Sequence, residues 1–312
     1  MKTFAPALLP FLLGAGSLSA QTNEPAPDQS GVETPSAKSE IVVRAPVGST
    51  ERRIQLREMV SDLINEPRKG QTVATYFRAI CPRVIGLPEA ETRLIEERIR
   101  ENAETLGANR RDETKNCKPN VTVIFVPASK GPPENWMTYE NDMLGHLLSY
   151  QRLAVLDEHD PVRAWTFNEE RGPDGAPLTN AYGQRVSGAL DFSNSLRSVS
   201  RLKVNTTVEI SEAAVLIELA SAQGKTLQQL ADYASMRTFG NTRSLAPDAV
   251  PAAETILTLF RDDDPPEGLT TFDRALISKL YSTSRRSLAR RFYSNIAGRA
   301  FEMEKEERAE MP

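Results

Sequence analysis

The chain has 312 residues and is mildly acidic, with 38 lysines and arginines, 42 aspartates and glutamates, and a formal net charge of −4. This charge argues against nucleic-acid binding, which needs clustered cationic groups. The length suits one large domain or two small ones. No internal repeat divides the chain, so we expect one domain.

The first 20 residues have the pattern of a secretory signal peptide. Lys2 precedes an apolar run over 4–15, and the small residues of "SLSA" at 17–20 come just before Gln21. The run covers about a dozen residues, fewer than the ~20 that a membrane span needs. We therefore predict a periplasmic or secreted protein with no transmembrane segment after signal cleavage.

Residues 21–38 predict a disordered leader. They are rich in proline, serine, threonine and glutamate, so they cannot bury enough apolar surface to offset the entropy of ordering. Removing the signal peptide also removes Lys2, and the net charge becomes 37 − 42 = −5. We assign the rest of the chain to an α+β domain at 39–283 and a C-terminal amphipathic helix at 284–312.

Strands and helices intermix in the next part of the chain. The patterns predict, in order, a strand at 40–46, a helix at 51–65, a strand with a turn at 72–88, a helix at 88–108 and a buried strand at 120–127. The helix at 88–108 is the clearest, because Pro88 suits a first turn and Gly107 ends it. We expect Ile54 and Leu94 on the buried sides of their helices.

Cys81 and Cys117 are the only two cysteines. In an oxidising compartment an even pair favours a structural disulfide, and neither residue sits in a CxxC motif that would suggest redox catalysis. We therefore predict a Cys81–Cys117 bridge. The chain-entropy model gives it a stabilisation of about 3–4 kcal/mol.

The second half of the chain adds further elements of both kinds. They are a helix at 134–158, a strand at 162–172, strands at 203–210 and 213–219, and helices at 224–241, 251–260, 270–282 and 284–306. The order has no strict strand–helix–strand rhythm. It predicts an α+β fold, a single mixed domain with a small central sheet and several helices.

Common catalytic signatures are missing from the sequence. It has no Gly-x-Ser-x-Gly elbow and no phosphate-binding GxxxxGK[ST] loop. His146 lies on an apolar helix face and His159 in a polar turn, and their spacing fits no zinc signature. We predict no catalytic residue, no metal site and no cofactor.

The helix at 224–241 contains an eight-residue frame comparable with a zinc-protease helix. That frame is "YASMRTFG" at 233–240, and it keeps the closing glycine of His-Glu-x-x-His…Gly while it lacks every ligand. A second string, "LTTFDRALISKLY", resembles the segment that follows the active site in secreted zinc peptidases. We predict a helix there with Thr270 or Thr271 as N-cap and Asp273 in its first turn.

The chain also resembles a family of uncharacterised secreted proteins from alphaproteobacteria. The strings that carry this resemblance are "CPRVIGLP", "CKPNVTVIFVP", "QLADYASMR" and "LTTFDRALISKLY", over about residues 70–282. The peptidase resemblance of "YASMRTFG" and "LTTFDRALISKLY" implies in addition a zincin-like fold without its metal. The resemblance maps the ligand positions onto Tyr233 and Arg237 and the general base onto Ala234.

Tyr233 and Arg237 allow two interpretations. A phenol and a guanidinium can bind an anionic group if they face a cleft. Alternatively, the helix packs through its apolar residues and leaves the remaining side chains in solvent. The second interpretation assigns no ligand to this helix.

The C-terminal helix is basic at its start and amphipathic. Arg285, Arg286, Arg290 and Arg291 crowd this start, and Leu288, Phe292, Ile296 and Ala300 recur every four residues. Such a helix can bind an anionic envelope polymer or an envelope protein. Its apolar stripe can equally dock on its own domain.

We therefore expect a periplasmic or secreted protein that binds a ligand or associates with the envelope without catalysis. The alternative is a hydrolase that uses carboxylates without a histidine-liganded metal. A purely structural envelope component held by the C-terminal helix is a third possibility.

Overall fold

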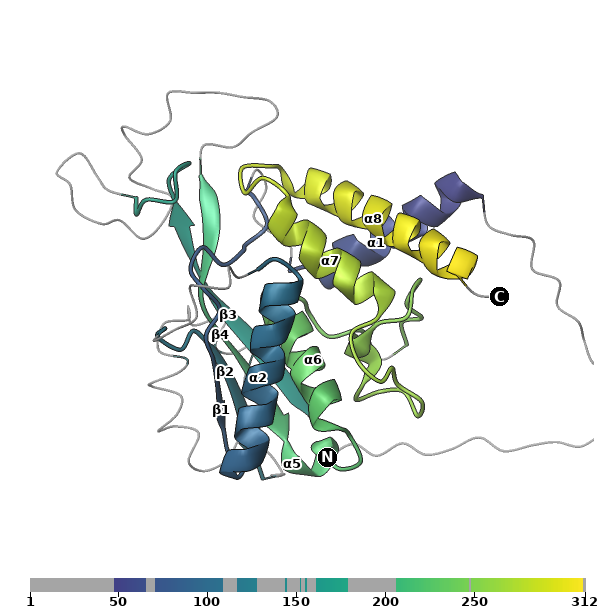
Figure 1. The fold of residues 1–312 in the computed structure, drawn as a ribbon. Helices are drawn as coiled ribbons and strands as arrows, with labels where there is room; N and C mark the ends of the chain where they lie inside the picture. The colour runs from purple at the N-terminus through teal and green to yellow at the C-terminus, as the bar shows by residue number, and fades with distance from the viewer. Residues whose placement is uncertain are drawn as a thin grey trace, which may run out of the picture. The chain divides into compact units, whose positions relative to one another are not determined.

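A four-stranded mixed sheet organises the chain in the computed structural model (Figure 1). Its strands lie in the order β1-β2-β4-β3. β1, β2 and β4 are parallel, and β3 runs antiparallel to β4 at one edge. The strands are β1 Pro82–Ile85, β2 Val121–Val126, β3 Val162–Arg171 and β4 Thr207–Glu218. The predicted α+β fold is confirmed.

The structure describes residues 48–65, 71–108, 117–127, 161–178, 206–246 and 248–310, together with Leu144, Arg152 and Val155. Several predictions fall outside these residues. They concern the signal peptide, the leader, the strand at 40–46, most of the helix at 134–158, and both histidines.

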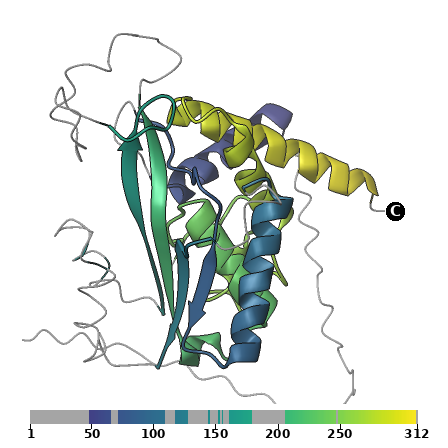
Figure 2. The same ribbon diagram turned by 60° about the vertical axis from the view of Figure 1, so that its left-hand side comes forward.

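Helices pack against one face of the sheet (Figures 1 and 2). α2 and α6 lie side by side there, and α7, α8 and α1 continue the same layer. The helices are α1 Ser49–Leu63, α2 Glu89–Thr105, α5 Leu219–Ala222, α6 Leu227–Phe239, α7 Thr271–Ser282 and α8 Ala289–Glu310, with a short 3-10 helix η2 Ile256–Thr258. The predicted helix at 251–260 is thus only one 3-10 turn.

The alternation of side chains along β2 shows the two faces of the sheet. Val123 and Phe125 belong to the main apolar core beneath the helices. Ile124 points to the opposite face, where it packs with Leu216 and Trp165. Leu144 and Val155 pack against the same tryptophan. Both faces of the sheet are therefore covered here, which explains why β2 carries apolar side chains on both of its sides.

β4 is one strand of twelve residues, so the prediction of two separate strands was wrong. The pairing with β3 shifts: Asn168 pairs with Ile210, but Phe167 pairs with Glu212, so Ser211 has no partner on β3. Ser211 is the extra residue of a β-bulge. The bulge changes the phase of the strand, so that Val208, Ile210, Ala213, Val215 and Ile217 all reach the main core.

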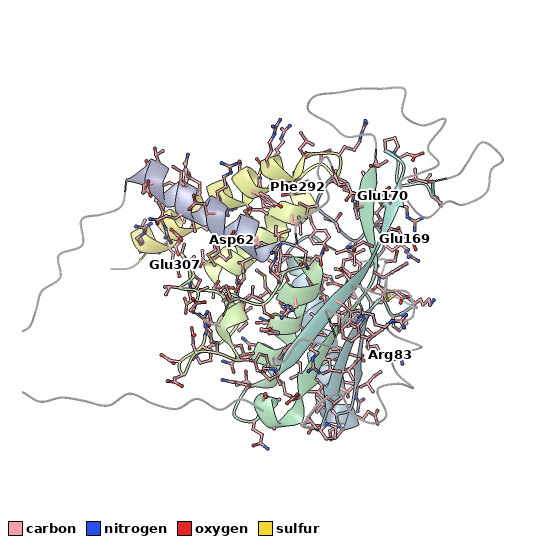
Figure 3. All side chains as sticks on the ribbon, turned by 180° about the vertical axis from the view of Figure 1, so that it is seen from behind. Asp62, Arg83, Glu169, Glu170, Phe292 and Glu307 are labelled. Carbon is pink, nitrogen blue, oxygen red and sulfur yellow. A yellow bond between two sulfur atoms is a disulfide. The ribbon has the colours of Figure 1, made fainter. Side chains whose placement is uncertain are left out.

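α8 docks on its own domain through its apolar stripe. Phe292, Ile296 and Ala300 are fully buried in the main core, and Figure 3 shows Phe292 on α8. The acidic half of α8 contacts α1, where Arg52 makes two charged hydrogen bonds to Glu304, at 3.0 and 2.6 Å. Glu304, in the second half of the helix, is therefore committed to an ion pair within the domain.

Three details of the helices differ from the predictions. α8 begins at Ala289, because residues 284–288 form a turn ahead of it. Ile54 on α1 is 44% exposed and Leu94 on α2 is 54% exposed. Leu56 and Ile95 are buried in the core instead. Helical spacing shows that a helix has an apolar side, but it does not show which residues at the border of that side are buried.

α6 ends at Gly240 for a reason of packing. Gly240 has an ordinary helical φ of −79°, and it is Asn241 that adopts the left-handed conformation, with φ 46°. A Cβ on Gly240 would lie 3.0 Å from the Met236 carbonyl oxygen and 3.2 Å from Leu276 Cδ2. The glycine allows α6 and α7 to approach closely.

Gly240→Ala is expected to lower the free energy of unfolding by about 1–3 kcal/mol, because the added methyl group overpacks this contact. Gly298→Ala is the matched control, since an added Cβ there meets no part of the described chain within 4 Å. Inside α8 it should raise the free energy of unfolding by about 0.5–1 kcal/mol. Urea unfolding followed by circular dichroism measures both, and equal effects would contradict the packing role of Gly240.

Candidate functional site

Tyr233 and Arg237 lie inside the protein, side by side on α6. Their exposed fractions are 4% and 3%. Arg237 Nη1 donates to the Tyr233 hydroxyl at 2.8 Å and to Ser244 Oγ at 2.9 Å, and its Nε donates to the Thr242 carbonyl at 3.1 Å. The guanidinium thus holds the loop after α6. The prediction of anion binding required that the two side chains face a cleft, whereas here both are enclosed. Anion binding by this pair stays a prediction.

Asp232 is the most completely satisfied charge on the same helix. Its side chain is fully buried. Arg98 donates to both of its oxygens, at 2.8 and 3.0 Å, and Asn102 donates to Oδ1 at 2.7 Å. The Leu269 backbone N–H donates to Oδ2 at 3.0 Å. One carboxylate therefore connects α2, α6 and the loop that leads into α7.

The surroundings of Asp232 depend on a glycine and on a charged hydrogen bond. A Cβ on Gly268 would lie 2.7 Å from Asp232 Oδ2, so only glycine permits this approach. The hydrogen bonds that Arg98 donates to Asp232 raise the pKa of Arg98. The interpretation of α6 as an apolar stripe with solvated polar residues is wrong, because every residue from Gln229 to Phe239 is buried.

Asp273 begins α7 and is also fully buried. Thr270 is the N-cap, and its hydroxyl accepts from the Asp273 N–H at 3.2 Å, while the Asp273 carboxylate accepts from the Thr270 N–H at 3.0 Å. The same carboxylate accepts from the Thr255 hydroxyl at 2.6 Å and from the Ile256 N–H at 2.8 Å. Burial raises the pKa of Asp273 to about 6, although these donors oppose the shift.

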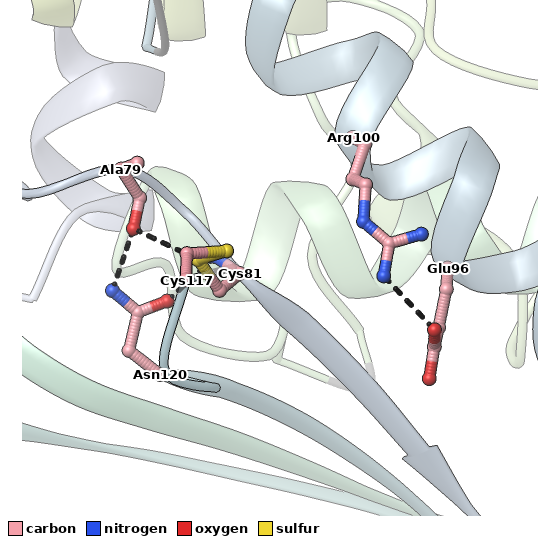
Figure 4. The surroundings of a disulfide bond; sticks show 6 residues. All are labelled: Ala79, Cys81, Glu96, Arg100, Cys117 and Asn120. Atoms are coloured by element: carbon pink, nitrogen blue, oxygen red, sulfur yellow. Dashed lines mark hydrogen bonds and ion pairs between the residues drawn. A yellow bond between two sulfur atoms is a disulfide. The ribbon is translucent and has the colours of Figure 1, made fainter. Parts of the chain in front are cut away.

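The Cys81–Cys117 disulfide is present, as predicted, and joins the starts of β1 and β2. Figure 4 shows Asn120 beside it. Asn120 accepts from the Cys81 N–H at 2.8 Å and donates to the Ala79 carbonyl at 2.9 Å. Glu96 of α2 accepts from the Val84 N–H at 3.0 Å, which satisfies a donor of the edge strand β1.

A pocket of about 450 Å³ lies next to this disulfide. One wall comes from the chain before and after the two cysteines, including Phe77 and Pro119. The other comes from Ser211 and Glu212, at the bulge of β4. Sequence reasoning missed this pocket, although the change of phase between "VEI" and "AAVLIEL" in β4 was its visible signal.

The predicted C-terminal arginines are not gathered into one site. Arg285 stacks on the Phe77 ring, with its guanidinium carbon 4.3 Å from the ring centre, and donates to the Tyr76 carbonyl at 3.3 Å. Arg286 is half-buried in the turn before α8. Arg290 and Arg291 are exposed in the first turn of α8.

Carboxylates at the start of β4 and near the end of β3 are neutralised by arginines. Glu209 is 3% exposed, and it pairs with Arg171 at 2.6 Å and with Arg78 at 3.2 Å. Arg171 also pairs with Glu169 at 2.7 Å. Figure 3 shows Glu169 beside Glu170 on β3. This network ties β3 and β4 to the segment that precedes β1.

Within the ranges that the structure describes, no group of three or more histidine, cysteine, aspartate or glutamate side chains could hold a metal ion. None of the helices in those ranges is long and apolar enough to cross a membrane.

No protein-family model, curated protein or solved structure matches this chain. The resemblances to a secreted alphaproteobacterial family and to zinc peptidases therefore stay predictions that rest on the quoted strings.

Tyr233→Phe is expected to lower the free energy of unfolding by about 1–3 kcal/mol, because it leaves a buried Arg237 donor without its acceptor. Tyr76→Phe is the control: its hydroxyl is buried and has no hydrogen-bond partner among the described residues, so its loss should cost almost nothing. Chemical unfolding of both variants provides the comparison. A harmless Tyr233→Phe would show that the phenol does not hold the guanidinium.

Asp273 should make the protein less stable as the pH rises from about 4 to above 6. The folded-state pKa of about 6 exceeds the usual 3.8, so the native state binds more protons than the unfolded state in this window. The stabilising contribution is full below about pH 4 and falls by up to ~1.4 kcal/mol per pH unit until the carboxyl has ionised.

Asp273→Asn tests this dependence, because an amide can accept from the two backbone donors and donate to Thr255. Its free energy of unfolding, measured by urea titration across the window, should lose this slope. Asp62→Asn, at an exposed position on α1 (Figure 3), should keep it. An unchanged slope in Asp273→Asn would assign the pH dependence to another group.

Proposed function

We propose that this chain is a non-catalytic binding protein of the periplasm or the extracellular space, associated with the cell envelope. The observation that carries the proposal is the enclosure of Tyr233 and Arg237. The peptidase resemblance assigns the metal-ligand positions to these two residues of α6. They are buried, hydrogen-bonded to each other, and Arg237 also donates to the loop at 242–244.

The compartment is supported by the Cys81–Cys117 disulfide. Disulfides persist in oxidising compartments and are rare in the cytosol of most organisms. The signal-peptide pattern of residues 1–20 points the same way. Both observations favour export of the chain.

A zincin-like ancestry is part of the same proposal. The two strings that suggested it fall on α6 and on α7 with its N-terminal cap. The two helices are joined through the Asp232 hydrogen bond to the Leu269 N–H. A fold that lost its metal ligands could keep this contact as a structural one.

Arg290 and Arg291 are the best-placed residues for an envelope partner. They are exposed, and neither side chain has an ion-pair partner in the part of the chain that the structure describes. The apolar stripe of α8 is docked, so contact with an anionic envelope polymer or an envelope protein would be electrostatic and sensitive to salt.

The alternative, a hydrolase that uses carboxylates, has less support. Glu209, Asp232 and Asp273 are the buried acids among the described residues. Each is held by two or more donors from other parts of the chain. Groups fixed in this way are structural rather than placed to attack a substrate.

The proposal predicts where the protein is found and what it lacks. Cell fractionation should recover it outside the cytoplasm, starting at Gln21, with both cysteines resistant to alkylation until reductant is added. Purified mature protein with zinc added back should cleave neither casein nor a mixed peptide library.

A second measurement makes the test decisive. Metal analysis of natively purified protein should find zinc far below one ion per chain. Stoichiometric zinc with protease activity would overturn the non-catalytic proposal. Recovery in the cytoplasm with reduced cysteines would overturn the assigned compartment.

A further inference from the structure

We propose that the pocket beside the Cys81–Cys117 disulfide binds a small zwitterion with an apolar body, of which an apolar amino acid is the simplest example. This inference rests on the proposed binding function and names a site for it. The pocket has a volume of about 450 Å³, within the range of about 300–1,000 Å³ that is usual for small-molecule sites.

The pocket lies where β4 changes its neighbour. Along its first half, β4 pairs with the segment before β1: the Thr75 N–H donates to the Val208 carbonyl at 3.1 Å, and the Ile210 N–H donates to the Thr75 carbonyl at 2.9 Å. From Ala213 onward it pairs with β2. The two neighbours separate at Ser211 and Glu212, and this separation leaves the space.

The bulge determines which side chains border that space. In a regular strand every second side chain points to the same face, so Glu212 would lie on the core face together with Val208 and Ile210. The extra residue, Ser211, places Ala213 on the core face instead and leaves Glu212 exposed at the pocket. Bulges commonly redirect side chains next to functional sites.

Charges of both signs border the pocket. Lys118 is exposed and makes no ion pair with any described residue. Arg78 uses its Nε for Glu209, which leaves its two terminal nitrogens available. Glu212 lies on the opposite wall, on β4. A ligand with one anionic and one cationic group can satisfy these walls together, whereas a simple anion would face Glu212 unpaired.

The remaining lining is mostly apolar and fixed in place. Phe77 is held by the Arg285 guanidinium at 4.3 Å, and Gly175 leaves room for the ring edge. Pro119 and the disulfide complete this surface. The disulfide and the stacked Phe77 ring limit how far the walls can move. Binding would therefore cost little entropy for ordering the site.

Ser211 is a second sign of a polar ligand. Its hydroxyl is buried and has no hydrogen-bond partner among the residues described, a condition that destabilises the folded protein. The side chain lines the pocket, so its unsatisfied hydroxyl lies beside the space that a polar ligand would occupy.

The test uses three probes on the mature, disulfide-bonded protein. L-phenylalanine carries both charges, 3-phenylpropionate lacks the ammonium group, and 2-phenylethylamine lacks the carboxylate. Isothermal titration calorimetry should detect L-phenylalanine with a Kd of about 1 mM or tighter. Each half-molecule should bind about tenfold more weakly, because one charged hydrogen bond is lost.

Two variants assign the charges to the walls. Lys118→Ala should weaken L-phenylalanine and 3-phenylpropionate by about five- to tenfold and leave 2-phenylethylamine unchanged. Glu212→Gln should weaken L-phenylalanine and 2-phenylethylamine and leave 3-phenylpropionate unchanged. Lys305→Ala and Glu310→Gln, exposed at the far end of α8, are matched controls that should change nothing.

The outcomes separate this site from the general function. If none of the three probes binds, or if the controls weaken binding as much as the pocket variants, the pocket assignment is wrong. Absence of zinc-dependent proteolysis would in that case leave the proposed function intact with its site elsewhere. Zinc-dependent proteolysis together with the predicted probe pattern would overturn the non-catalytic proposal and keep the ligand site.

Discussion

β4 must present apolar side chains to the core along twelve residues, although its sequence changes phase in the middle. A strand with strict alternation cannot do this, because its two halves would point their apolar residues to opposite faces. The bulge at Ser211 solves the conflict by adding one residue. The rest of the sheet depends on this solution, since β4 pairs with both β2 and β3.

The same constraint explains why an opening exists in this sheet. A bulge bends the strand and increases its twist, and at this position β4 also exchanges the segment before β1 for β2. The Cys81–Cys117 disulfide and the two hydrogen bonds of Asn120 fix the chain on the far side of the gap. The opening is thus bordered by cross-linked backbone.

Charges on α6 serve a different purpose. Asp232 and Arg237 are both buried on this helix, and a buried charge is tolerated only when neighbouring groups replace its hydration. Asp232 receives donors from α2 and from the loop before α7. Arg237 gives its donors to neutral oxygens of its own helix and of the following loop. These bonds specify how α6 sits between its neighbours.

Much of the local structure could be predicted from the sequence. Periodicity located α1, α2, β2, β3 and α6, and the threonine–aspartate spacing located the cap of α7. The disulfide followed from the number of cysteines and the expected compartment. These signals are local, or depend only on composition, so no knowledge of the packed fold was needed.

The site could not be predicted, because its residues meet only in three dimensions. Lys118 and Glu212 lie far apart in the chain, and no spacing rule connects a residue after a cysteine with a residue at a bulge. The burial of Arg237 could not be predicted from the sequence either, since an arginine in a helix is usually exposed to solvent. The phase change in β4 is present in the sequence, but from sequence alone a bulge cannot be distinguished from the end of one strand and the start of another.

The polar residues of α6 and those beside the pocket differ in how far protein groups already satisfy them. Those of α6 face inward and are satisfied by protein groups, so they have little capacity left for a ligand. Lys118 and Glu212 are in the opposite condition: they are exposed, carry opposite charges, and border a pocket whose walls are already fixed. Recognition requires groups that still lack partners in the folded protein. By that criterion the proposed small-molecule site fits the pocket at the bulge of β4 better than the enclosed polar residues of α6.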